Sequence, residues 1–171
     1  QFGSYEQKTF LGYNDGHGRF TDSTGSMPPI STLPTALAAA DIDLDGDQDL
    51  LIGGRDNDDG SGGGLDRMFQ DGGVFLHPDG STTHQWLGGE TTDLAAGDLD
   101  GDGDLDVLHA NTWTFFAIDG VLYNDGSGAF VYDTGLSAFV EAYEVELLDL
   151  EQDGDLDALI SGATSQLYRR D

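Results

Sequence analysis

Fifteen acidic side chains, grouped in three short stretches, are the residues of this chain best suited to chemistry. Each stretch places an acid at every second position across nine residues, has glycine at the sixth position, and runs on into apolar residues. We number these positions 1 to 9 and call residues 41–49, 98–106 and 149–157 the first, second and third loops. The acids are Asp41, Asp43, Asp45, Asp47 and Asp49; Asp98, Asp100, Asp102, Asp104 and Asp106; and Asp149, Glu151, Asp153, Asp155 and Asp157. A random acidic composition would not keep this register in all three loops.

The pattern predicts calcium sites. Calcium takes about six to eight hard oxygen ligands, which short carboxylates on a tightly curved backbone can supply. Glycine at position 6 permits the sharp turn that brings both halves of a loop around one ion. Without a cation, two like charges about 4 Å apart repel by roughly 1 kcal/mol in water and about 4 kcal/mol at an effective dielectric constant near 20. We therefore expect one Ca²⁺ ion in each of the three loops; the alternative is that the loops are solvated acidic turns.

The neighbouring residues distinguish these loops from EF-hands. An EF-hand needs a bidentate acid at position 12 and a helix on each side. Position 12 is here Ile52, His109 and Ile160. The last acid lies instead at position 9, directly before apolar, partly β-branched runs that are typical of buried strands. We therefore expect each loop to join two strands.

The loops and the strands after them resemble the FG-GAP repeat family, also called VCBS repeats, which forms the calcium-bearing blades of integrin α-subunit-like β-propellers. The family's loop reads D-x-D-x-D-G-x-x-D before an apolar strand, and all three loops match it. The resemblance implies that the side chains at positions 1, 3, 5 and 9 and the backbone carbonyl at position 7 bind calcium. Two features depart from the family pattern: Glu151 is one methylene longer than aspartate, and the Gly-Ala-Pro signature is absent.

A second signature recurs with the loops. Aromatic residues flank an Asp-Gly turn that follows Tyr13, Phe69 and Tyr123, a pattern that favours β-hairpins. These aromatics are 56 and 54 residues apart (69 − 13 and 123 − 69), and the loops begin 57 and 51 residues apart (98 − 41 and 149 − 98). A double repeat of this period is typical of solenoids and propellers. Each period has room for four strands, which is the content of a propeller blade.

We therefore predict an all-β fold of β-propeller-type, four-stranded blades in about three repeats. Residues 1–34 would end a preceding blade and form a connection, 35–92 a blade with the first loop, 93–141 a blade with the second, and 142–171 a partial blade with the third. Propellers close with about four to eight blades, so the ring is expected to be incomplete in this chain. In the last segment we expect Leu167 and Tyr168 to correspond to Leu122 and Tyr123.

Charge and composition limit the partners. The formal charge is -27, and three calcium ions would bring it to -21 (-27 + 6). Such a charge argues against nucleic acid and anionic membranes, and no apolar run is long enough to insert into a membrane. Cysteine is absent, which excludes disulfides, thiol catalysis and cysteine metal sites. Because calcium loops of modest affinity need the calcium concentration found outside cells, we expect a secreted or cell-surface protein.

The resemblance implies a module for adhesion or recognition of a protein or carbohydrate, in which calcium is structural. Two alternatives stay open: a lectin in which Trp86, Trp113 or Tyr143 stacks on a sugar, and a structural subunit whose incomplete blades associate into a ring or fibre. We expect no enzymatic activity, because calcium would hold the clustered carboxylates ionised and the chain has no nucleophile or phosphate-binding motif. The four histidines share no spacing and are expected at the surface or in turns.

Overall fold

The chain folds into antiparallel β-structure. The computed structural model describes residues 9–28, 30, 33–55, 64–71, 74–76, 85–86, 90–112, 120–133, 142–163 and 165–168, and only the backbone of residues 64–71, 74–76, 85–86 and 166. The strands are β1 (Gly12–Asn14), β2 (Phe20–Asp22), β3 (Leu33–Ala40), β4 (Asp49–Arg55), β5 (Gly64–Asp71), β6 (Val74–Leu76), β7 (Gln85–Trp86), β8 (Glu90–Gly97), β9 (Asp106–Thr112), β10 (Gly120–Asn124), β11 (Phe130–Asp133), β12 (Ala142–Leu148), β13 (Asp157–Gly162) and β14 (Gln166–Tyr168). Apart from one 3₁₀ turn, Thr24–Ser26, these ranges contain no helix, so the all-β prediction is confirmed. No helix in the described ranges has the length and apolar character to cross a membrane.

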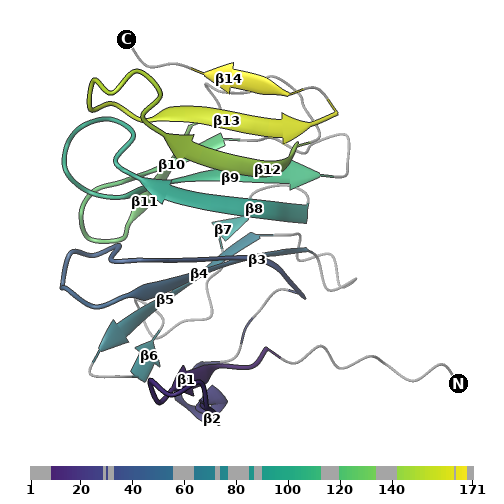
Figure 1. Ribbon diagram of the computed structural model, residues 1–171, viewed down its shortest axis with the longest axis vertical. Coiled ribbons are helices and arrows are strands. Elements are labelled where there is room, and N and C mark those ends of the chain that lie inside the picture. The colour runs from purple at the N-terminus through teal and green to yellow at the C-terminus, as the bar shows by residue number, and fades with distance from the viewer. Residues whose placement is uncertain are drawn as a thin grey trace, which may run out of the picture.

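The described strands form four small sheets that follow one another along the chain. β1 pairs with β2, the strands β3 to β6 form the next sheet with β7 added to β5, β8 to β11 form a four-stranded sheet, and β12 to β14 form a three-stranded sheet. All of these pairings are antiparallel. Figure 1 shows the sheets stacked in chain order along the long axis, with β1 and β2 at the bottom and β14 at the top.

Each acidic loop closes an antiparallel strand pair. The residue before the loop pairs with the acid at position 9: Ala40 with Asp49, Gly97 with Asp106, and Leu148 with Asp157. The expectation that each loop joins two strands is therefore confirmed. The equal register also makes the three loops directly comparable, position by position.

The apolar core lies between neighbouring sheets. One cluster joins Ile42 and Leu51, from the first loop and β4, to Leu94, Val107 and Leu122 of the β8–β11 sheet. A second cluster packs the other face of that sheet against the β12–β14 sheet; it contains Leu108, Ala110, Val121, Ala142, Val145, Ala158 and Ile160. Strands of the middle sheet are therefore apolar on both faces, which explains why β9 is buried along nearly its whole length.

A β-bulge interrupts the first strand of each pair, and in two of the three it carries a threonine that bonds to the next sheet. The register shifts at Thr35 in β3, Thr92 in β8 and Tyr143 in β12, all six residues before a loop begins. Thr35 Oγ1 donates to the Thr91 carbonyl, and Thr92 Oγ1 donates to the Ala142 carbonyl at 2.9 Å. Such bulges bend a strand and re-aim its side chains. These two hydrogen bonds thus connect successive sheets.

The pairing of β14 corrects one predicted correspondence. Tyr168 lies opposite Ala158, at position 10, just as Leu122 lies opposite Val107. Tyr168 therefore corresponds to Leu122, one residue away from the alignment that the shared Leu-Tyr pair suggested. The repeated dipeptide misled the prediction because strand pairing, and not local similarity, fixes the register.

Candidate metal centres

The backbone of all three loops turns in the same way. Glycine at position 6 is left-handed in each, with φ of 97° at Gly46, 99° at Gly103 and 99° at Gly154. A second left-handed residue, at position 4, is glycine only in the second loop; Leu44 and Gln152 each have φ of 60°. L-residues adopt this conformation at a cost of roughly 1–2 kcal/mol. Two left-handed residues two positions apart give the loop the curvature that points its carboxylates inward.

Two carboxylates fix each loop by accepting backbone amides. At position 9, the Oδ2 atoms of Asp49, Asp106 and Asp157 accept the amide of position 2 at 2.9, 2.8 and 3.1 Å. At position 1, the Oδ2 atoms of Asp41, Asp98 and Asp149 accept the amide of the position 6 glycine at 3.0, 3.1 and 3.0 Å. Both acids are therefore positioned by backbone amides of the loop itself.

Three carboxylates converge in each of the first two loops. Ligand oxygens of Asp41, Asp43 and Asp49 all lie within 4.8 Å of one another, as do those of Asp98, Asp100 and Asp106. These are positions 1, 3 and 9. We call them the first and second carboxylate triads. Asp49 and Asp106 are 0% and 1% exposed. The position 9 acid of each triad is therefore shielded from solvent, while the acids at positions 1 and 3 are partly or fully exposed.

Positions 5 and 7 lie outside the triads. The Oδ1 atoms of Asp45, Asp102 and Asp153 accept the amide of position 7 at 2.9, 3.2 and 3.2 Å. At position 7, the side chains of Asp47 and Asp155 are half-buried and that of Asp104 is buried. The resemblance assigns position 7 a backbone carbonyl ligand, and these side chains do not contradict that assignment.

The first triad contains a buried oxygen without a partner. Asp41 Oδ1 is inaccessible to solvent and has no hydrogen-bond partner among the described residues. A buried unpaired carboxylate oxygen is costly, and native proteins rarely leave one without a water or an ion. The donor set consists of hard oxygens alone, which suits Ca²⁺ or Mg²⁺ and not a soft metal. The residues of the first triad therefore fit a calcium ion.

The third loop is built differently at position 3. In the first two loops the amide of position 5 donates to the position 3 aspartate, Asp45 to Asp43 at 3.3 Å and Asp102 to Asp100 at 3.2 Å. In the third loop the amide of Asp153 donates to Asp149 Oδ1 at 3.1 Å instead. Among the described residues of this loop no three acids converge as in the triads. The side chain of Glu151 is one methylene longer than that of aspartate and is exposed.

The surroundings of the triads disfavour the ionised form of several carboxylates when no cation is bound. Burial, together with the charges of Asp45 and Asp41, raises the pKa of Asp43. Burial also raises the pKa of Asp106, against the opposing effect of two amide hydrogen bonds. Beside the second triad, burial and the neighbouring Asp102 raise the pKa of Asp104 to about 6. A divalent cation at the loop centre would reverse these repulsions.

Asn124 is a residue near the loops that the sequence analysis did not single out. It ends β10, is 6% exposed, and hydrogen-bonds to residues of both the first and the second loop. It belongs to the Asn-Asp-Gly turn, which is repeated at Asn14 and could have drawn attention to it. Its contacts could not be predicted, because they join residues 82 positions apart.

The position of His109 differs from the one expected for the histidines. The histidines were expected at the surface or in turns, and His17 is exposed, but His109 is 0% exposed. His109 lies at position 12 of β9, and its ring stacks on Tyr132 of β11, in the same sheet, at 5.5 Å between ring centroids. Burial lowers the pKa of His109 to about 4, with the side chain of Asn111 opposing the shift. His77 and His84 are outside the described residues.

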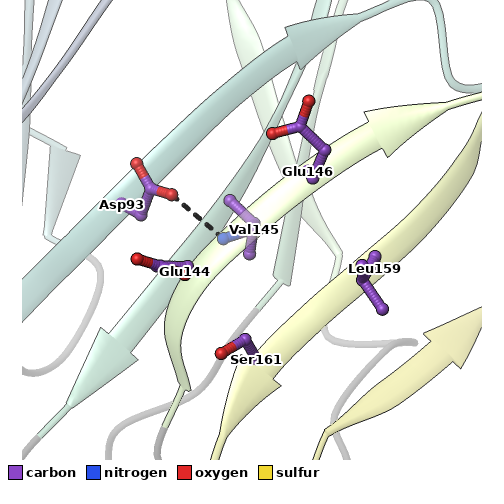
Figure 2. A pocket seen from close by; sticks show the side chains of 6 residues that line it. All are labelled: Asp93, Glu144, Val145, Glu146, Leu159 and Ser161. Carbon is purple, nitrogen blue, oxygen red and sulfur yellow. Dashed lines mark hydrogen bonds between the residues drawn. The ribbon is translucent and has the colours of Figure 1, made fainter.

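The three aromatics proposed for ligand contact are not brought together by the described structure. Tyr143 is 51% exposed at the bulge of β12. Trp86 ends β7, where only the backbone is described, and Trp113 is outside the described residues. A hollow does lie over β12 and β13, but Tyr143 does not line it (Figure 2). Its lining residues are Asp93, Glu144, Val145, Glu146, Leu159 and Ser161.

Comparison with known proteins adds no assignment: no protein-family model matches this chain, and no curated protein matches it.

Proposed function

We propose that this chain is a calcium-binding repeat module whose acidic loops hold structural Ca²⁺ between paired strands. The observation that carries the proposal is the convergence of three aspartates within 4.8 Å in each of the first two loops. The buried unpaired Oδ1 of Asp41 supports it. Calcium would neutralise part of the -27 charge and stabilise the fold by binding only the native loops.

In this proposal the loops belong to β-propeller-type blades like those of the FG-GAP repeat family. The matching D-x-D-x-D-G-x-x-D motif and the four-stranded sheet of β8 to β11 support that architecture. The resemblance also supports an extracellular role in adhesion or recognition, with a protein or a carbohydrate as ligand. A glycan array with the Tyr143→Ala variant as control would separate carbohydrate recognition from protein adhesion.

Calorimetric titration with calcium tests the metal sites. Asp43→Asn keeps the oxygen that accepts the Asp45 amide and removes only the charge, and Asp100→Asn does the same in the second triad. Each variant should weaken calcium binding at its own site by tenfold or more, about 1.4 kcal/mol. Asp22→Asn is the matched control, because Asp22 Oδ1 accepts an amide outside the loops. Wild-type protein that is folded and releases no heat with calcium would contradict the proposal.

A second candidate function is self-association through the outer face of the β12–β14 sheet. Leu159 at position 11 is 42% exposed, whereas the corresponding Leu51 and Leu108 are 0% exposed beneath the next sheet. Leu150 at position 2 is 45% exposed, whereas Ile42 is 0% exposed. This face therefore has the apolar positions of an inter-sheet contact, and we propose a second copy of the chain as its partner.

Sedimentation velocity over a range of concentrations tests this association. Wild-type protein should form dimers or larger species, and Leu159→Lys should remain monomeric. Val131→Lys is the control, since Val131 is 70% exposed on β11, a strand of the preceding sheet. Monomeric wild-type protein at all concentrations would reject self-association.

A further inference from the structure

Asn124 uses every polar atom of its side chain. Nδ2 donates to the carbonyl of Ile42 at 2.7 Å and to the carbonyl of Leu105 at 3.1 Å. Oδ1 accepts the amides of Asp125 and Gly128, each at 2.9 Å. A fully satisfied, buried amide of this kind holds its partners in one arrangement.

Its contacts reach both carboxylate triads. The backbone amide of Asn124 donates to Oδ1 of Asp106, the position 9 acid of the second triad, at 2.9 Å. Ile42, which accepts from Asn124 Nδ2, donates its own amide to Oδ2 of Asp49, the position 9 acid of the first triad, at 2.9 Å. One residue thus connects the buried acids of two triads that belong to different sheets.

We infer that Asn124 couples calcium binding at the first and second triads, so that an ion in one raises the affinity of the other. This inference rests on the proposed calcium function. An ion that fixes Asp106 also fixes the amide of Asn124, which holds Ile42 and, through it, Asp49. The second ion then binds a loop that is already ordered, and the coupling is reciprocal between the two sites.

Asn14 provides a matched control within the chain. Its Oδ1 accepts the amides of Gly16 and Gly18 at 2.9 and 3.2 Å, and the second of these matches the bond from Gly128 to Asn124. Both turns also have left-handed glycines at the same two positions, Gly16 and Gly18 in one and Gly126 and Gly128 in the other. Asn14 is exposed, and among the described residues its side chain makes no hydrogen bond to an acidic loop. Asn14→Asp and Asn124→Asp therefore make the same change in two turns, of which only one contacts the triads.

The test is a thermodynamic cycle by calorimetry in about 0.15 M salt, which limits direct repulsion between the ions. In the wild-type background, disabling the first triad with Asp43→Asn should weaken calcium binding at the second triad by about fivefold or more. In the Asn124→Asp background the same change should have no further effect on the second triad, and in the Asn14→Asp background the full effect should remain. If the second triad binds equally well with and without Asp43→Asn, the coupling is rejected while the calcium function stands. If the wild type binds no calcium, the proposed function itself fails.

A spectroscopic readout does not depend on the folding of an Asn124 variant. In Asp100→Asn protein, where only the first triad is intact, calcium should shift both the backbone and the side-chain amide signals of Asn124 in ¹⁵N NMR spectra and leave those of Asn14 unchanged. Asn124 signals that stay in place while the first triad fills would overturn the inference.

Discussion

At the scale of single residues, position 12 shows how one side chain sets the pH response of the fold. Ile52 and Ile160 fill this position in β4 and β13, and both are buried. β9 has His109 there, and neither of its ring nitrogens has a hydrogen-bond partner of normal geometry among the described residues. Burial resists protonation of the imidazole and outweighs the opposing effect of the Asn111 side chain, which agrees with the fall of the His109 pKa to about 4.

Replacing His109 with isoleucine should remove this pH dependence. Between pH 6.5 and about 4 the unfolded chain binds a proton at His109 that the folded chain does not, so the wild type loses stability as the pH falls through this range. The difference in pKa corresponds to a loss of about 3 kcal/mol. His109→Ile should therefore gain stability over the wild type as the pH falls from 7 to 4.5, measured by urea unfolding.

The control is to compare the unfolding free energies of the two proteins at each pH. The loop acids, including Asp104, titrate in both proteins, so their contribution cancels in the difference. A stability difference that is constant across this range would show that His109 is not the source.

At the scale of elements, the third loop has the same strands and the same glycine turn as the first two and differs at one ligand position. The amide of Asp153 donates to Asp149 Oδ1, whereas the corresponding amides of the first two loops donate to the position 3 aspartate. We therefore expect the third loop to bind calcium more weakly than the triads.

Glu151→Asp should restore the third triad. Calcium affinity of the third loop should rise by about tenfold, because a shorter carboxylate can both accept the Asp153 amide and face the loop centre. Calorimetric titration would detect the gain as an additional tight site. Glu146→Asp shortens an exposed glutamate on β12 outside the loops and serves as control; an equal effect of both variants would contradict this account.

The strand pairs and loop turns could be predicted from the sequence, because they depend on local chemistry. Glycine at position 6 and an apolar run after position 9 suffice to place a turn between two strands. The left-handed Leu44 and Gln152 could not be predicted, since neither residue type favours that conformation. Nor could the surroundings of His109 and Asn124, because His109 stacks on Tyr132 two strands further along the chain and Asn124 bonds to Ile42, which is 82 residues away.

At the scale of the whole molecule, the sheets are held together by the apolar clusters between them and by a few hydrogen bonds that recur from sheet to sheet. Thr35 and Thr92 make the same contact in successive sheets, while Tyr143 occupies their position in β12 and is half exposed. The repeat therefore extends to the contacts between sheets, and not only to the loops. The acidic loops lie at one end of their strand pairs, on the left in Figure 1, so calcium there would act on one edge of the stack.

Native mass spectrometry with and without calcium shows directly whether the loops hold metal ions. We expect two ions per chain at limiting calcium, one in each triad, with a third ion only in excess calcium and none after chelation. Asp43→Asn and Asp100→Asn should each remove one of the first two ions. A folded chain that retains no calcium under these conditions, or that fills its third loop first, would contradict the account.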